Sequence, residues 1–276
     1  MSPSRYLSLH ASTPAAAAQT SRLLKTVDPK DLEYEVLYFP ISCIGATPRH
    51  ILAYGKANWH NKHPDDFFGA ESLEKFDCPF GVMPKLTIKT AAAGQNDKET
   101  GGDVQEAVVT ESFAIDLYLA EKFGLFGESA HEEQVIKSFY STIHYLRERS
   151  LMRVTWTFPD KRPESWVTFT QTVLPRWIKL QEQHLENNGS NGHFVGEKIS
   201  LADIHLVSVI DHFAELPRGE EIVAQFQASS LLWKVHETVV QNPEIATWRE
   251  SEEFANMVKG GKKLYSVSAF EDKKEE

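Results

Sequence analysis

The sequence predicts an α/β amino-terminal half followed by an all-helical carboxy-terminal half, and three observations lead to this fold class. Short β-branched and aromatic runs occur between residues 34 and 110. A short linker, Gly124 to Ser129, follows them. Beyond residue 130 the apolar residues recur at helical spacing, and no strand pattern of any length appears. We therefore expect two domains, which a chain of 276 residues is long enough to form.

The first half alternates strand and helix patterns. We expect strands over residues 34–39, within 56–77, over 85–89 and over 107–109, and helices from Thr47 to Gly55, around Leu73 and over 111–123. Thr47 suits an N-cap with Pro48 at the first helical position, and Gly55 suits the helix end. Alternation over 85–89 predicts a strand with one wet face, and residues 90–106 an extended hairpin loop.

The order β-α-β followed by β-β-α is the thioredoxin-like layout. Met83-Pro84 leads a strand of this layout, and a proline at that place is often cis. An ordinary edge-strand proline fits the same pattern equally well.

The second half predicts a series of helices. Their expected ranges are 131–156, 164–185, a helix from Ser200 onward, 231–240 and 244–258. Pro175 should kink the second helix or mark a boundary in it. Ser200-Leu201-Ala202-Asp203 is a capping-box pattern, and the stripe Leu201, Ile204, Val207 and Ile210 must face a core.

Composition excludes several function classes. The net charge of -10 argues against broad binding to a nucleic-acid backbone. With only Cys43 and Cys78, a disulfide framework is not expected and a reducing compartment is favoured. The sequence has no zinc-type Cys/His spacing, so we expect no metal, and no apolar run approaches the ~18 residues that span a bilayer. We interpret nearly all eleven histidines as surface or capping residues.

The amino-terminal segment leaves two interpretations open. Residues 1–26 contain three cations and no acidic residue, which suits a mitochondrial transit peptide, but a disordered or loosely docked tail fits better because the cations are sparse. We therefore expect a cytoplasmic protein, with a mitochondrial location as the alternative. The expected organisation is a flexible extension over 1–33, the α/β domain over 34–124, the helical domain over 131–265 and a charged tail over 266–276.

Four fragments, in order, resemble the cytosolic glutathione transferase family over about residues 34 to 260. They are Phe80-Gly81-Val82-Met83-Pro84, Thr110-Glu111-Ser112 with Ala114-Ile115, Tyr118-Leu119-Ala120, and Gly196 with Ser200-Leu201-Ala202-Asp203. The resemblance implies that family's fold, a thioredoxin-like domain followed by an all-α domain. It also implies glutathione as co-substrate and a homodimer.

The resemblance also implies which residues bind glutathione. The Met83 backbone, ahead of Pro84, should pair with the cysteinyl part of the tripeptide. Ser112 at a helix start suits the γ-glutamyl carboxylate, and Glu111 suits the ammonium group. Lys75 would meet the glycyl carboxylate with Phe68 packed beside it, although Lys75 fits a solvated surface lysine equally well.

Catalysis requires a donor that stabilises the glutathione thiolate, because a free thiol has a pKa of about 8.5. Tyr38, followed by Phe39, resembles the donor of the tyrosine-type classes, the sigma class among them; a packing role in the strand is the alternative. Cys43 resembles the cysteine of the omega-type classes, but a small buried residue fits better. Ser42 resembles the serine-type classes and ranks last. Ile44 stands where many tyrosine-type members have an arginine near the thiol.

The sequence therefore favours an enzyme that conjugates glutathione to small electrophilic or hydrophobic substrates, in the manner of detoxification enzymes, with Tyr38 as the thiol activator. A glutathione-dependent thiol reductase or deglutathionylase that uses Cys43 is an alternative. The other alternative is a non-catalytic binding protein of the same fold, for which the missing cation at Ile44 and the long 90–106 insert leave room.

Overall fold

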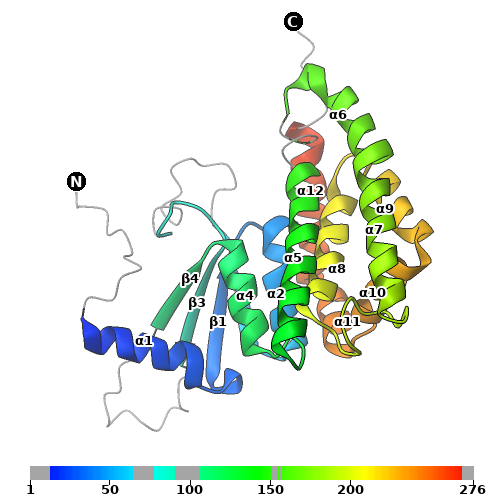
Figure 1. The fold of residues 1–276 in the computed structure, drawn as a ribbon. Coiled ribbons are helices and arrows are strands. Elements are labelled where there is room, and N and C mark those ends of the chain that lie inside the picture. Colours follow the sequence, from blue (N-terminus) through cyan, green and yellow to red (C-terminus); the bar gives the residue numbers. More distant parts are fainter. Residues whose placement is uncertain (1–12, 65–77, 91–105, 151–154, 156, 269–276) are drawn as a thin grey trace, which may run out of the picture. The chain divides into compact units, whose positions relative to one another are not determined.

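The computed structural model describes residues 13–64, 78–90, 106–150, 155 and 157–268. The chain divides into two compact units (Figure 1). The α/β unit contains residues 1–39 and 51–123, and the helical unit contains residues 40–50 and 124–276. The sequence placed residues 40–50 in the α/β domain instead. The predictions for Lys75, Phe68, the helix near Leu73 and the 91–105 insert fall outside the described residues.

The α/β unit is built on a four-stranded sheet of order β2-β1-β3-β4. Its strands are β1 (Leu32–Leu37), β2 (Asn58–Lys62), β3 (Lys85–Thr90) and β4 (Glu106–Thr110). β1 pairs with β2 in parallel and with β3 antiparallel, and β3 pairs antiparallel with β4. The predicted strand order along the chain is therefore confirmed, with β1 beginning and ending two residues earlier than expected.

The expectation of a wet face on β3 is wrong. Its first four residues, Lys85 to Ile88, are all buried. The side chains on both faces of β3 are therefore covered, the polar Lys85 and Thr87 as well as the apolar Leu86 and Ile88.

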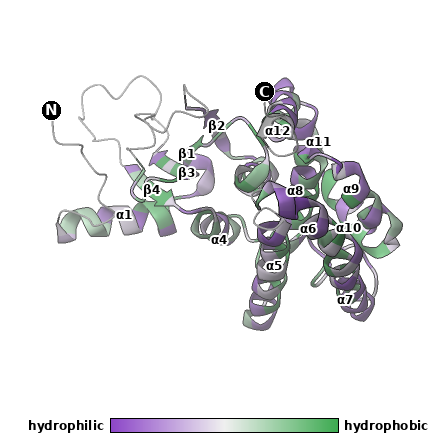
Figure 2. Cartoon of the chain, turned by 90° about the horizontal axis from the view of Figure 1, so that it is seen from above, coloured by the Kyte–Doolittle hydropathy of each residue, from purple (hydrophilic) through white to green (hydrophobic). Residues whose placement is uncertain are grey.

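The amino-terminal extension is a packed helix where it is described, so the expectation of a flexible 1–33 segment is wrong for that part. Helix α1 (Pro14–Thr26) is capped by Thr13, whose hydroxyl oxygen accepts the Ala16 amide at 3.1 Å. α1 lies beside β4 (Figure 2). Leu23 is fully buried, and the Lys122 ammonium donates to the carbonyl oxygens of Leu24 and Val27.

Helix α4 (Ser112–Lys122) packs against β3 and β4, with its buried face formed by Ile115, Leu119 and Ala120. The helix ends at Lys122, and Phe123 beyond it packs against the Tyr34 ring at 6.0 Å. A Cβ on Gly55 would lie 2.2 Å from Phe123, so glycine is required there by close approach.

Helix α2 (Ala46–Tyr54) begins one residue before the predicted N-cap, and Thr47 does not cap it. A 3₁₀ turn over Cys43–Gly45 leads into the helix instead. The Thr47 hydroxyl is engaged elsewhere, 2.7 Å from Nδ1 of His205. A tertiary partner has thus overridden a local capping signal.

The helical unit contains only helices in its described part, as the sequence predicts. They are α5 (Ala130–Ser150), α6 (Arg162–Thr168), α7 (Leu174–Asn187), α8 (Leu201–Glu215), α9 (Gly219–Ala228), α10 (Ser230–Val240), α11 (Pro243–Arg249) and α12 (Glu252–Ser268). The boundary expected at Pro175 is confirmed, because a π-helical segment over Phe169–Val173 separates α6 from α7. Helix α9 was not predicted.

Helix α8 is the centre of the helical unit, and every residue in it except Ala214 is buried. The predicted capping box at its start is confirmed. One carboxylate oxygen of Asp203 accepts the Ser200 amide and hydroxyl, both at 2.8 Å. The other accepts the Phe194 amide at 2.8 Å.

We expect Asp203→Ala to lower the free energy of unfolding by about 3–5 kcal/mol, because it leaves buried donors without an acceptor. Urea unfolding followed by circular dichroism measures the change. Asp203→Asn, which keeps the size and one acceptor oxygen, should fall between wild type and Asp203→Ala. A loss below about 1 kcal/mol for Asp203→Ala would contradict this role.

The interpretation of the histidines as surface residues is wrong for several of them. His50, His205 and His212 are fully buried. His50 Nδ1 lies 3.1 Å from the Ser208 hydroxyl, and its Nε2 lies 3.7 Å from Asp211. These contacts tie the first turn of α2 to α8, which explains why residues 40–50 group with the helical unit.

Candidate functional site

One edge of the sheet gathers residues from all four strands. Lys62, Leu37, Lys85 and Thr110 occupy one continuous row of paired positions across β2, β1, β3 and β4. The residues just outside this row therefore lie side by side at the edge. They are His63, Tyr38, Met83-Pro84 and Glu111-Ser112.

Tyr38 is fixed at this edge through its backbone. Its amide donates to the Lys62 carbonyl at 3.1 Å, and Nδ1 of His63 lies 2.8 Å from the Tyr38 carbonyl oxygen. The side chain is buried, and its ring meets that of Phe39 edge-on at 5.5 Å. His63 was missed in the sequence. Its signal is its place directly after β2, because the parallel pairing puts that position beside the end of β1.

The Met83-Pro84 peptide bond is cis, which decides between the two interpretations of this proline. Met83 is buried, and Pro84 directly precedes β3. Within the described part of the chain, neither backbone group of Met83 has a hydrogen-bond partner. An extended peptide could therefore pair with Met83 as an added strand does.

Glu111 has a backbone conformation that is unusual for a residue with a side chain, with φ 73° and ψ 123°. Such a conformation costs on the order of 1–3 kcal/mol and is found preferentially at functional sites. It turns the chain from β4 directly into α4, whose first turn starts at Ser112. The Glu111 side chain does not cap the helix. The first N–H groups of α4 can therefore donate hydrogen bonds to an anion.

The two other candidate thiol activators lie in the helical unit, and both are buried. Cys43 is a free cysteine at the start of the 3₁₀ turn and has φ 35°. The Ser42 amide donates to Oε1 of Glu215 at 3.4 Å. Arg49 holds the preceding peptide, donating from Nη1 to the Ile41 carbonyl at 2.6 Å.

Glu215 is a buried carboxyl at the end of α8. Burial is the main cause that raises its pKa to about 8, and the carboxylate of Asp211 adds to the rise. The Ser42 hydroxyl and the Arg49 guanidinium act in the opposite direction. A Cβ on Gly261 of α12 would lie 2.1 Å from Oε2 of Glu215, so the helix backbone closes over the carboxyl.

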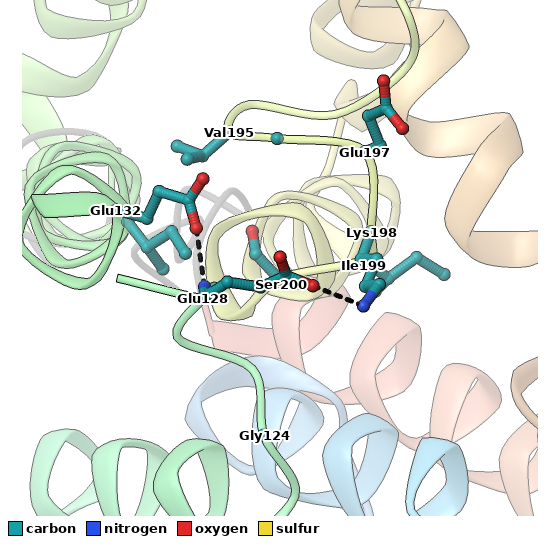
Figure 3. A pocket seen from close by; sticks show the side chains of 11 residues that line it. Gly124, Glu128, Glu132, Val195, Glu197, Lys198, Ile199 and Ser200 are labelled. Atoms are coloured by element: carbon teal, nitrogen blue, oxygen red, sulfur yellow. Dashed lines mark hydrogen bonds and ion pairs between the residues drawn. The ribbon is translucent and has the colours of Figure 1, made fainter. Parts of the chain in front are cut away.

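A separate cavity of about 340 Å³ lies where the linker meets the segment before α8 (Figure 3). Contacts join three of its four charged residues, Glu128, Glu132 and Lys198. Glu132 accepts the Glu128 amide at 2.6 Å, and the Lys198 ammonium donates to Glu128, also at 2.6 Å. These contacts join the linker to the helical core and leave no evident chemical role.

Among the described residues, none of the helices combines the length and the apolar composition that a membrane span requires. In the same residues no group of histidine, cysteine or acidic side chains is arranged to hold a metal ion.

Comparison with known proteins shows which family this chain is similar to. A family model described as "Glutathione S-transferase, C-terminal domain" matches residues 148–252. A probable glutathione S-transferase 7 of Caenorhabditis elegans is 28% identical over 228 residues, which is 80% of this chain and 97% of the relative. A glutathione S-transferase of Anopheles gambiae is 26% identical over 67% of this chain and 82% of its own length. The chain is therefore similar to glutathione transferases over most of its length.

Solved structures show the same fold. The structure of prostaglandin synthase D of Nilaparvata lugens matches with a TM-score of 0.63 at 21% identity, covering 80% of this chain and 98% of that chain. The Pi-class glutathione S-transferase of Onchocerca volvulus matches with a TM-score of 0.62 at 21% identity, covering 80% and 94%. The chain has the glutathione transferase fold. At these identities the structures speak for the fold alone.

Proposed function

We propose that the chain is a glutathione transferase that conjugates the glutathione thiolate to small electrophilic substrates. One observation carries this proposal: the paired row of the sheet brings Tyr38, Met83-Pro84 and Glu111-Ser112 to a single edge. These are five of the site residues predicted from the sequence, and they come from three separate stretches of chain.

Each part of this edge suits a part of the tripeptide. The unpaired Met83 backbone suits the cysteinyl portion, as an antiparallel strand addition. Ser112 and the uncapped start of α4 suit the γ-glutamyl carboxylate, because helix amides and the helix dipole both favour an anion. Glu111 suits the ammonium group. Lys75 and Phe68 remain the prediction for the glycyl end.

Tyr38 is the proposed thiol activator. A phenolic hydroxyl directed at the sulfur would stabilise the thiolate and lower its pKa. The nearby cation of many tyrosine-type relatives is replaced by Ile44, so we expect Tyr38 to supply most of the stabilisation. The Tyr38-Phe39 pair also supports assignment of the chain to a sigma-like class. Isomerisation of lipid-derived substrates is therefore a further possible activity under this proposal.

Cys43 is the basis of the alternative, a glutathione-dependent thiol reductase or deglutathionylase. Its side chain is only 5% exposed, which argues against attack on a bulky disulfide. A non-catalytic binding protein would bind glutathione and turn over nothing.

One set of assays separates these functions. Wild type, Tyr38→Phe and Cys43→Ser are compared in conjugation of a generic electrophile and in reduction of a glutathione mixed disulfide. Conjugation that depends on Tyr38 and not on Cys43 is the expected result. Disulfide reduction lost only in Cys43→Ser would replace the proposal with the reductase. Glutathione binding without turnover would replace it with the binding protein.

The same resemblance supports a homodimer and a role in detoxification. We infer a cytoplasmic location, with a mitochondrial one if residues 1–26 act as a transit peptide. Sedimentation of the purified protein tests the dimer.

A further inference from the structure

Helices α5 and α8 lie side by side in the helical unit (Figure 1), and buried polar side chains gather where they meet. On α5 they are His144 and Arg147, and on α8 they are His205 and His212. The two α8 histidines are seven residues apart, which places them on one face of their helix. The His144 ring stacks on the His205 ring at 5.8 Å and so joins the two helices. Arg147 is 1% exposed, and both α8 histidines are fully buried.

The Arg147 guanidinium is only partly compensated. Its Nη2 lies 3.1 Å from Nδ1 of His144 and 3.5 Å from a carboxylate oxygen of Glu148. The Glu148 side chain is 37% exposed, so water weakens its attraction for the guanidinium. Nε and Nη1 are buried and have no hydrogen-bond partner in the described part of the chain. Nε has one N–H and Nη1 has two, and a buried charge whose donors lack acceptors destabilises a fold.

The two histidines of α8 add further unpaired atoms. Nδ1 of His205 lies 2.7 Å from the Thr47 hydroxyl, and its Nε2 is buried without a partner among the described residues, as are both ring nitrogens of His212. Burial, and after it the Arg147 cation, lowers the pKa of His212 to about 3, and the same two causes lower the pKa of His205. The guanidinium is therefore close enough to act on both rings, and both rings are neutral near pH 7.

These unpaired groups require an acceptor with a negative charge. A neutral imidazole carries one N–H, so His212 contributes one more donor that lacks an acceptor. A water molecule would bring two additional donors to this place and would leave the positive charge uncompensated. An anion only accepts hydrogen bonds, and it would neutralise the guanidinium. Because Arg147, His205 and His212 are at most 1% exposed, the anion that they enclose must be small.

We propose that the contact between α5 and α8 binds a small inorganic anion of the halide class, held by a free nitrogen of Arg147 and by the rings of His205 and His212. The bound anion ties α5 to α8 through side chains of both helices. The site consists of residues of the helical unit alone. It therefore goes beyond the proposed conjugation of glutathione and does not depend on Tyr38.

Urea unfolding of the full chain in chloride tests the proposal. Chloride replaces gluconate at constant ionic strength, up to about 200 mM, so that the screening of surface charges stays the same. An anion that binds only the folded chain raises the urea midpoint, and the rise levels off as the site fills. When chloride reaches about 100 times its dissociation constant, the midpoint should be higher by about 1 M.

Variants locate the site. Arg147→Met should abolish the saturable rise, and it should be at least as stable as wild type in gluconate alone because it removes a buried charge. His212→Phe keeps a ring against Tyr265 and loses both nitrogens, so it should raise the chloride concentration at half effect by about 10-fold. Lys179→Met removes an exposed cation on α7 and is the matched control, which should show the wild-type rise.

Crystals grown in sodium bromide locate the anion directly. An anomalous difference peak should lie within hydrogen-bond distance of the Arg147 guanidinium, between α5 and α8. The proposal would be overturned by a midpoint that rises without levelling off, by a wild-type rise in Arg147→Met, by loss of the rise in Lys179→Met, or by a water molecule without a bromide signal at this place. None of these results bears on Tyr38, and loss of conjugation with the chloride effect intact would count against the proposed function alone.

Discussion

Tyr38→Phe should lower kcat/KM for glutathione conjugation by about 100-fold at neutral pH. Loss of one preorganised donor to a developing or stable anion typically costs ~100–1,000-fold in rate. In the variant the pKa of the bound glutathione thiol should rise toward the free value of about 8.5. Thiolate absorbance in the ultraviolet, titrated against pH for each complex, measures that pKa directly.

Phenylalanine keeps the ring, so the packing of Tyr38 on Phe39 is retained and the KM for glutathione should change little. Cys43→Ser is the matched control and should retain conjugation. Equal thiol pKa values in wild type and Tyr38→Phe complexes would remove Tyr38 from the mechanism, whatever happened to the rate.

Glu215→Gln should stabilise the protein at alkaline pH by several kcal/mol. Burial raises the pKa of Glu215 to about 8 in the folded chain, from the ordinary value of 4.5 for an exposed glutamate. As pH rises from 4.5 to 8, the unfolded chain releases this proton while the folded chain keeps it. Stability therefore falls over that window, by about 1.4 kcal/mol for each pH unit. Glutamine has no proton to lose, so the variant should lack this decline.

Urea unfolding of wild type and Glu215→Gln at pH 5, 7 and 9 measures the difference. The two proteins should differ little at pH 5, and the advantage of the variant should be full at pH 9. Glu220→Gln, which changes an exposed carboxyl at the start of α9, should leave the pH profile unaltered. An advantage that is constant from pH 5 to 9 would contradict the account.

The buried histidines make the stability of the protein depend on pH in the acidic range. Burial lowers the pKa of His50 to about 4 and of His212 to about 3, and it lowers that of His205 as well. These groups stay neutral in the folded chain while the unfolded chain gains protons below about 6.5. Wild-type stability should therefore fall as the pH drops from 6.5 toward 4, and the urea midpoint measures this fall.

A local sequence signal is sufficient to predict a structural feature that depends only on residues close together in the sequence. The Ser200–Asp203 capping box and the break at Pro175 are of this kind. The start of α2 was predicted wrongly because Thr47 bonds to His205, a residue 158 positions away. Burial of both faces of β3 also depends on what packs on the sheet, which the alternation within the strand does not contain.

In the candidate site, too, the residues set by local sequence were predicted and one that depends on strand pairing was missed. Glu111-Ser112 and Met83-Pro84 were predicted from short motifs, because each is a local junction between a loop or strand and the next element. His63 was missed because only the pairing of β1 with β2 brings it next to Tyr38. For Cys43 the sequence favours a small buried residue over a reactive cysteine, and the side chain is buried in the structure.

The central claim is that the sheet edge holds glutathione by its γ-glutamyl end at Ser112. Calorimetric titration with glutathione and with the dipeptide Cys-Gly, which lacks that end, tests it most directly. Glutathione should bind at least 10-fold more tightly to wild type, and Ser112→Ala should remove most of that preference, while Ser141→Ala on the exposed face of α5 should preserve it. Equal affinities for the two peptides in wild type, or no heat with glutathione, would contradict the account.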